Sequence, residues 1–190
     1  MGKHILILQG HPDPSARHLC HALADAYAAG AIAGGHALRL RDIAELDFPL
    51  LRSEQDWEHG SVPPSLAAVQ HDLAWAEHLV VIYPLWLGDM PALLKGFLEQ
   101  VARPGFAFRD GRAPALGGRS AHLVVTMGMP AFIYRWWYGA HSLLSFKRNI
   151  LHFVGIRPVR ATLIGGVGQL SPERAQRWLD KLEACGQQAR

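Results

Sequence analysis

The sequence has few cysteines and no long hydrophobic run, and each shortage excludes a class of protein. Two of its 190 residues are cysteines, Cys20 and Cys185, so neither a disulfide framework nor a CxxC redox motif is available. No apolar stretch approaches the roughly 20 residues that cross a bilayer. The first residues enter an apolar strand without a charged leader. These features predict a cytoplasmic protein with no membrane insertion.

Runs of like charge are also missing, which argues against a nucleic-acid-binding surface. Residues 1–95 contain six Lys and Arg against eleven Asp and Glu, whereas residues 96–190 contain thirteen against five. The basic residues of the second half are scattered among Gly, Pro and aromatic residues. We therefore expect no nucleic acid partner. This half is expected to attract an anionic small molecule or to contact another subunit.

Glycine is scarce at the place where most nucleotide-binding loops need it. Gly10 is the only glycine in the turn after the apolar run 5–8, which excludes both a GxGxxG fingerprint and a Walker loop. In front of the following helix, the turn instead offers side chains that can donate to a phosphate: His11, Ser15, Arg17 and His18. The alternative is an ordinary strand-to-helix connection in which Ser15 only caps the helix.

The hydrophobic pattern predicts one α/β domain over residues 1–190. A chain of this length with 49% hydrophobic residues can bury one substantial core. Apolar strands are predicted at 4–9, 37–40, 78–83, 122–126 and 159–164, and helices at 18–33, 64–77, 91–102, 142–154 and 171–186. This alternation predicts a three-layer sandwich around a five-stranded parallel sheet. Five strands are typical of flavodoxin-like folds, with the order 2-1-3-4-5 and a binding site where strands one and three end.

Capping residues suggest where these helices begin and end. Helix starts are predicted at Ser65, Pro91 and Ser171, and Gly186 is predicted to end the last helix. The segment 43–63 has no clear periodicity, so we expect it to cross the surface without regular structure.

Two further strand ends carry candidate binding segments. Pro84 ends the third strand and leads into Leu85, Trp86 and Leu87, whose backbone N–H groups can face a planar ring. The alternative is that Trp86 packs in the core. The fourth strand leads from Thr126 and Gly128 into an aromatic segment whose polar groups are Tyr134 and His141. That segment can also be a subunit contact, and both functions are compatible if a pocket forms at the seam.

Together these segments resemble the flavodoxin-like NAD(P)H:quinone oxidoreductase family. The family includes DT-diaphorase and the bacterial modulator-of-drug-activity and potassium-efflux ancillary proteins. The similarity covers most of the chain, through residues 10–18, 84–96, 126–141 and 149–155. Its most specific piece is PLW followed by PALLKG within residues 84–96.

The resemblance implies a homodimer that binds FAD, or FMN as second choice. NAD(P)H would be the co-substrate, and two electrons would pass through the flavin to a quinone or similar small acceptor. The flavin would contact residues from all three segments: His11, Ser15, Arg17, His18, Pro84, Leu85, Trp86, Leu87, Thr126 and Gly128. Tyr134 and His141 would be catalytic, as hydrogen-bond partners of the reduced ring.

Of three other functions, only the first stays open on the sequence alone. A regulatory subunit of a transporter would use the same flavin- or nucleotide-binding body with little turnover. A zinc hydrolase motif is suggested by His11, Pro12 and Asp13, but Pro14 stands where it needs a further acid, so we expect no metal site. A phosphoacceptor receiver domain needs an Asp at the end of the third strand, where Pro84 stands.

Overall fold

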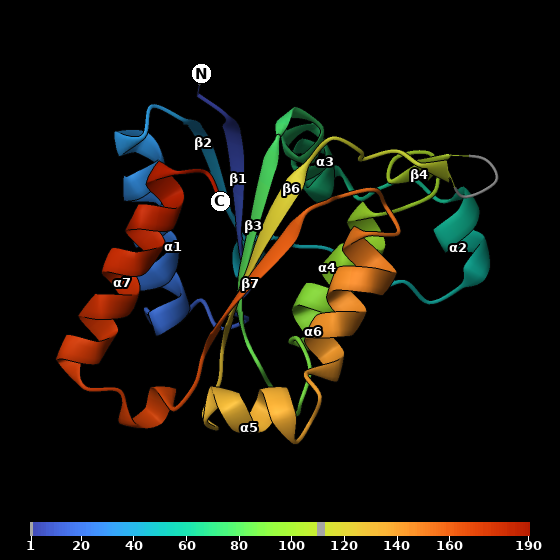
Figure 1. Cartoon of the computed structure of the whole chain (residues 1–190). Coiled ribbons are helices and arrows are strands. Elements are labelled where there is room, and N and C mark those ends of the chain that lie inside the picture. Colours follow the sequence, from blue (N-terminus) through green and yellow to red (C-terminus); the bar gives the residue numbers. More distant parts are fainter. Residues whose placement is uncertain (1, 110–112) are drawn as a thin grey trace.

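The computed structural model describes residues 2–109 and 113–190, which form a three-layer sandwich (Figure 1). The five strands of its central sheet are parallel and are ordered β2-β1-β3-β6-β7. They lie at His4–Gln9 (β1), Ala37–Asp42 (β2), His78–Pro84 (β3), Ser120–Thr126 (β6) and Val159–Ile164 (β7). The predicted order 2-1-3-4-5 is confirmed. The short strands β4 (Phe108–Arg109) and β5 (Ala113–Pro114) pair with each other outside this sheet.

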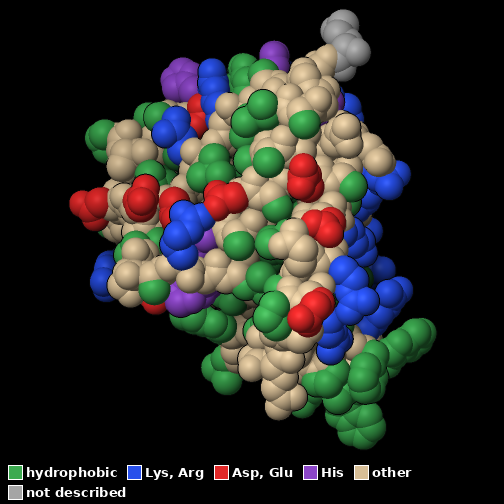
Figure 2. Space-filling view, turned by 90° about the vertical axis from the view of Figure 1, so that its left-hand side faces the viewer, with side chains coloured by type: hydrophobic (Ala, Val, Ile, Leu, Met, Phe, Trp, Pro, Cys, Tyr) green, Lys and Arg blue, Asp and Glu red, His purple; other side chains and the backbone are tan. Residues whose placement is uncertain are grey.

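The helices α1 (Leu19–Ala33) and α7 (Pro172–Gln187) cover the face of the sheet that lies on the left in Figure 1. Figure 2 shows the molecule from this side. Apolar residues from alternate positions of β1 and β3 pack against the two helices: Ile5, Ile7, Val80 and Ile82. The side chains of a buried parallel strand are apolar on both faces, which is why these runs had no polar interruption.

Two glycines allow α1 and α7 to approach each other closely. A Cβ at Gly30 would lie 1.9 Å from the Glu183 carbonyl oxygen, and one at Gly186 would lie 2.1 Å from the Tyr27 carbonyl oxygen. Gly186 was predicted to end the last helix, and that prediction is wrong, because α7 continues to Gln187. The glycine is required by the neighbouring helix rather than by the end of its own.

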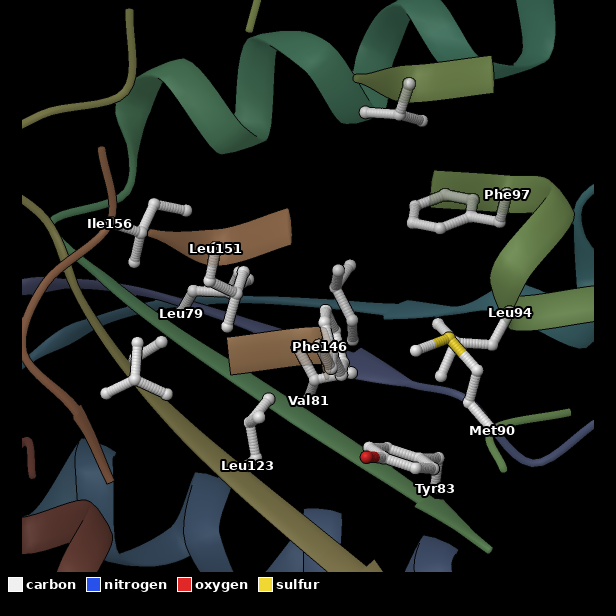
Figure 3. Packing of buried hydrophobic residues seen from close by; sticks show 14 of the residues in the cluster. Leu79, Val81, Tyr83, Met90, Leu94, Phe97, Leu123, Phe146, Leu151 and Ile156 are labelled. Atoms are coloured by element: carbon white, nitrogen blue, oxygen red, sulfur yellow. The ribbon is translucent and has the colours of Figure 1, made fainter. Parts of the chain in front are cut away.

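The opposite face of the sheet is covered by α3 (Pro64–Trp75), α4 (Ala92–Val101), α6 (His141–Ser145) and a single π-helical segment, η3 (Phe146–Leu151). Figure 3 shows how they meet the sheet: Leu79, Val81 and Tyr83 of β3 and Leu123 of β6 lie among Leu94 and Phe97 of α4 and Phe146 and Leu151 of η3. The α6–η3 part of this layer and the turn after β3 form opposite walls of the candidate site.

Other elements differ from the prediction. The single helix expected at 142–154 is divided between α6 and η3. Ser65 does not cap α3, which begins at Pro64, because the Ser65 hydroxyl donates to the Asp47 carbonyl oxygen. The segment 43–63 contains short helices, η1 (Ile43–Glu45) and α2 (Glu54–His59). Also unpredicted are α5 (Ala131–Trp136) and η4 (Val167–Gln169). Within the described ranges, no helix is both long and apolar enough to cross a membrane.

Candidate functional site

In the turn after β1, several hydrogen-bond donors converge on one carboxylate. Ser15 donates to Asp13 Oδ1 from its backbone N–H at 2.8 Å and from its hydroxyl at 2.6 Å. His18 Nε2 lies 2.9 Å from Asp13 Oδ2. The bonds from Ser15, followed by that from His18, hold the pKa of Asp13 well below its ordinary value. Asp13 therefore occupies the side-chain donors of Ser15 and His18 that the sequence predicts for a phosphate.

His11 connects this turn with the segment after β3. It is buried, and its ring stacks on the His18 ring with centroids 3.8 Å apart. The Trp86 ring lies edge-on to it, at 5.8 Å between centroids. Burial, then the neighbouring His18 and His21, lower the pKa of His11. Asp13 N–H donates to His11 Nδ1 at 3.2 Å, which fixes that nitrogen as an acceptor.

Arg17 lies outside this network. Its guanidinium pairs with Asp25, in the second turn of α1, and both side chains are exposed. Of the four residues predicted to bind phosphate, the structure thus brings His11, Ser15 and His18 together and leaves Arg17 on the surface of the helix.

A polar network that was not predicted from the sequence joins the ends of β1 and β2 to α1. The amide nitrogen of Gln9 lies 2.6 Å from His21 Nε2 and 3.3 Å from Asp42 Oδ2, and His21 Nε2 is 3.4 Å from the same Asp42 oxygen. His18 N–H donates to His21 Nδ1 at 3.0 Å, which ties this network to the start of α1. A signal was available, because Gln9 and Asp42 are polar residues that end adjacent parallel strands.

The segment after β3 forms a tight turn whose two central amides, at Leu87 and Gly88, have no acceptor among the described residues. Trp86 and Asp89 exchange backbone hydrogen bonds of 2.9 and 3.0 Å, and Leu85 N–H donates to the Thr126 carbonyl oxygen at 2.7 Å. Leu87, between them, has a φ of 48° and a fully exposed side chain. Left-handed backbone is uncommon for a residue other than glycine. Among the described residues no acceptor takes the Leu87 N–H, so this amide is available to a ligand.

The other strand-end residues differ in their exposure. Pro84 is buried and pairs across the sheet with Thr126. The Thr126 hydroxyl lies 3.3 Å from the Sγ of Cys20, whose pKa burial raises to about 11. Gly128 borders open space, since no described atom outside its chain neighbours lies within 4 Å of a Cβ built there. Thr126 thus faces the interior, whereas a ligand can approach the backbone at Gly128.

The two predicted catalytic residues lie in different environments. Tyr134 is buried, and its hydroxyl lies 2.7 Å from Ser142 Oγ and accepts the Leu143 N–H at 3.2 Å. His141 is the first residue of α6 and is exposed. The Tyr134 hydroxyl therefore fixes the start of α6, directly beside His141 in the chain.

A cavity of about 420 Å³ opens between the turn after β3 and the α6–η3 layer. Its lining is mostly apolar and includes Trp86, Met90, Lys95, Ser142, Phe146 and Ile150. This size and character suit a planar organic ring with one polar edge. In residues 2–109 and 113–190 no group of His, Cys, Asp and Glu is arranged to hold a metal ion.

Comparison with known proteins assigns the family. A model of the flavodoxin-like fold matches residues 3–188. The chain belongs to the flavodoxin-like family. Because the match covers nearly the whole chain, all three candidate segments of this flavodoxin-like protein lie within it.

Several relatives of this flavodoxin-like chain are named as oxidoreductases. An uncharacterized NAD(P)H oxidoreductase of Haemophilus influenzae is 27% identical, and the alignment covers 97% of this chain and 94% of that protein. An FMN-dependent NADH:quinone oxidoreductase of Shewanella amazonensis is 27% identical over 82% of this chain and 83% of its own. The solved structure of an NAD(P)H:quinone oxidoreductase from Methanothermobacter marburgensis superposes with a TM-score of 0.82, at 22% identity, covering 98% and 96% of the two chains. At that identity the structural likeness shows the fold.

Proposed function

We propose that this protein is an NAD(P)H:quinone oxidoreductase that binds FMN and transfers two electrons to a quinone or similar small acceptor. The observation that carries the proposal is the convergence of three segments at one edge of the sheet. The donors of the first turn lie beside Trp86, at 5.8 Å between the His11 and Trp86 rings. Leu85 ties the second segment to Thr126 of the third. The residues proposed to hold a phosphate thus lie beside those proposed to contact a flavin ring, at the edge where a flavodoxin-like sheet binds its ligand.

The residues present fit a flavin. The free Leu87 N–H, the open space at Gly128 and the cavity next to Trp86 suit a planar ring. Ser15 and His18 would hold a phosphate in place of the Asp13 carboxylate. FAD was the first choice from the sequence, but it has no support among the relatives above, one of which is named as FMN-dependent. We therefore reverse that order and propose FMN.

When bound, the flavin supplies the redox chemistry, because it can accept a hydride from NAD(P)H and give two electrons to an acceptor. The chain's own residues orient the reactants and hold charge. The apolar walls at Trp86 and Phe146 would stack nicotinamide or quinone and exclude water. The Leu87 N–H would donate to the ring edge, where preorganised donors stabilise developing negative charge.

His141 is the proposed catalytic residue, since its exposed imidazole can donate a hydrogen bond to the ring. Direct contact was also predicted for Tyr134. Its hydroxyl is already engaged by Ser142 and Leu143, so we propose that Tyr134 positions α6, and with it His141.

A homodimer and a cytoplasmic location belong to the same proposal and rest on the resemblance. Pro84 contributes to the proposed flavin site through the backbone path that it fixes after β3. Arg17 would contact the flavin phosphate only after leaving its partner Asp25. Analytical ultracentrifugation of the flavin-loaded protein tests the dimer.

The first test is the visible spectrum of the purified protein after incubation with FMN, or with FAD in parallel, followed by gel filtration. We expect retained yellow colour with FMN, bleaching under anaerobic NADH or NADPH, and return of the colour when a quinone is added. Failure to retain either flavin would contradict the assignments of all three segments. Retained flavin that neither nucleotide reduces would favour the alternative, a regulatory binding subunit of a transporter.

A further inference from the structure

An aromatic and basic surface lies beyond the candidate site, on α5 and α7. Its apolar part is exposed: Phe132 by 66%, Trp136 by 80%, Trp137 by 83% and Tyr138 by 53%. These side chains come from α5 and the two residues after it, at the lower end of the molecule in Figure 1. Figure 2 shows hydrophobic side chains protruding from that end, with Lys and Arg side chains directly above them. Exposed apolar clusters of this kind mark an interaction site.

The basic part of this surface comes from one face of α7. Arg174, Arg177 and Lys181 recur at helical spacing around Trp178, and the four side chains line one hollow. Lys181 Nζ lies 4.8 Å from the Trp178 ring. The acidic residues of α7, Glu173, Asp180 and Glu183, fall at other angles around the helix axis, at 100° per residue.

The aromatic and basic parts are continuous. A groove of about 680 Å³ between α5 and α7 is lined by Phe132, Arg135, Trp136, Trp178 and Lys181. The Arg135 guanidinium lies 5.9 Å from the Trp136 ring, so a cation also lies within the aromatic group. We call this combined area, residues 132–138 with Arg174, Arg177, Trp178 and Lys181, the α5–α7 surface.

We propose that the α5–α7 surface docks the protein onto an anionic phospholipid membrane. Indole and phenol rings favour the headgroup layer, because one edge is apolar and the other can hydrogen-bond. Lys and Arg beside them attract anionic headgroups. The contact lies at the surface of the bilayer and involves no spanning segment, in keeping with the helices described above.

The charge of the α5–α7 surface disfavours a second copy of the chain as its occupant. A two-fold interface brings the same patch of both subunits together. Here it would place Arg135, Arg177 and Lys181 near the same cations of the partner, and like charges across an interface weaken it. A deformable anionic lipid surface also accepts two protruding indoles without a matching pocket.

Docking would place the carboxyl edge of the sheet toward the bilayer, since α5 directly follows β6. If the proposed function holds, this orientation gives the cavity access to acceptors dissolved in the membrane. This consequence rests on the proposed function, whereas membrane binding itself needs neither flavin nor turnover.

The test is flotation of the full-length protein, without flavin or substrate, with vesicles of phosphatidylcholine alone or mixed with phosphatidylglycerol. We expect binding to the mixed vesicles only, a blue shift of tryptophan fluorescence, and loss of binding at high salt. The double variant Trp136→Ser/Trp137→Ser should lower the bound fraction roughly tenfold. The double variant Arg177→Glu/Lys181→Glu should lower the bound fraction to a similar extent, although it keeps every aromatic ring.

Ile32→Ser is the matched control, because Ile32 is a comparably exposed apolar residue on α1, 65% exposed. It should bind vesicles like the unchanged protein, and circular dichroism should show all variants folded. Absence of binding to the mixed vesicles would overturn the proposal. So would binding that survives the double tryptophan variant, or sedimentation showing that this variant converts a dimer into a monomer. A failed flavin test with intact vesicle binding would remove the proposed function and leave the docking surface.

Discussion

At the residue scale, Asp13 is the most informative side chain of the candidate site. Its carboxylate accepts both Ser15 hydrogen bonds and contacts His18, so it holds the donors that are proposed to bind the flavin phosphate. On that proposal, a phosphate would displace this carboxylate from Ser15 and His18 and then lie beside its negative charge. The turn is thereby preorganised for an anion while the resident anion competes with the incoming one.

Asp13→Asn should therefore tighten FMN binding. The amide oxygen keeps an acceptor for Ser15, whereas the like charge next to the phosphate disappears. We expect an affinity gain of about fivefold, on the order of 1 kcal/mol, in a flavin fluorescence titration. Asp180→Asn, an exposed change on α7, is the control and should leave the affinity unaltered. Weaker binding in Asp13→Asn would mean that the charged carboxylate organises the turn rather than competing with phosphate.

His141→Gln tests the proposed catalytic role. Glutamine can still donate a hydrogen bond but cannot become a cation, so stabilisation of the reduced ring should fall. We expect flavin reduction by NADH to slow by about tenfold to a hundredfold in stopped flow, with FMN affinity retained. His71→Gln, on the exposed side of α3, serves as the control. Equal reduction rates in both variants would rule out the role of His141.

At the scale of elements, the contact between α1 and α7 depends on glycine. Alanine normally stabilises a helix interior relative to glycine by about 1 kcal/mol. At Gly30 that preference is reversed, because a Cβ would lie 1.9 Å from the Glu183 carbonyl oxygen and 2.7 Å from its carbon. Backbone atoms cannot rotate out of the way, so the two helices must separate.

Gly30→Ala should lower the free energy of unfolding by about 1–3 kcal/mol, as overpacking does elsewhere. Urea denaturation followed by circular dichroism measures this change. Gly117→Ala is the matched control, since a Cβ there meets no described atom within 4 Å. If both variants were equally stable, α1 and α7 would have to be packed more loosely than described.

At the scale of the whole molecule, two buried histidines make stability depend on pH. His78 lies between the Tyr27 hydroxyl at 3.0 Å and Ser120 Oγ at 2.7 Å, and His122 Nε2 lies 2.9 Å from Thr162 Oγ1. Burial, with smaller effects of nearby cations, lowers the pKa of His78 to about 3 and that of His122 to about 4, from 6.5. Both rings are therefore neutral in the folded protein at neutral pH.

The unfolded chain binds protons at these histidines below about pH 6.5, whereas the folded chain resists protonation until about pH 4 and then about pH 3. More protons are bound by the unfolded state in that window, so stability falls as the pH falls through it. We expect the urea midpoint to drop as the pH falls from 6.5 to 4. In His122→Gln, the slope of the free energy of unfolding against pH should correspond to about one proton fewer taken up on unfolding. The exposed His59→Gln should keep the full slope, and parallel curves for all three proteins would contradict the assignment to His122.

Much of the fold could be predicted because hydrophobic periodicity is a local property. The uninterrupted runs at 5–8 and 78–83 identify strands buried on both faces, and their alternation with helical patterns predicts the layers and the parallel sheet. The strand order came from the flavodoxin-like type that five strands indicate, and the structure has that order. Local capping signals were weaker evidence. Ser65 and Gly186 look like helix boundaries, but one bonds to a distant carbonyl group and the other accommodates a neighbouring helix.

The sequence by itself determined the layers, because they follow from apolar spacing along the chain. It indicated the strand order and the edge of the candidate site only through the flavodoxin-like type that five such strands favour. The tertiary structure decided which site residues are available. Asp13 holds the donors of the first turn, Arg17 pairs with Asp25, Tyr134 is engaged by α6, and Leu87 keeps a free amide. These outcomes depend on hydrogen bonds and packing in the folded chain, which residue spacing does not encode.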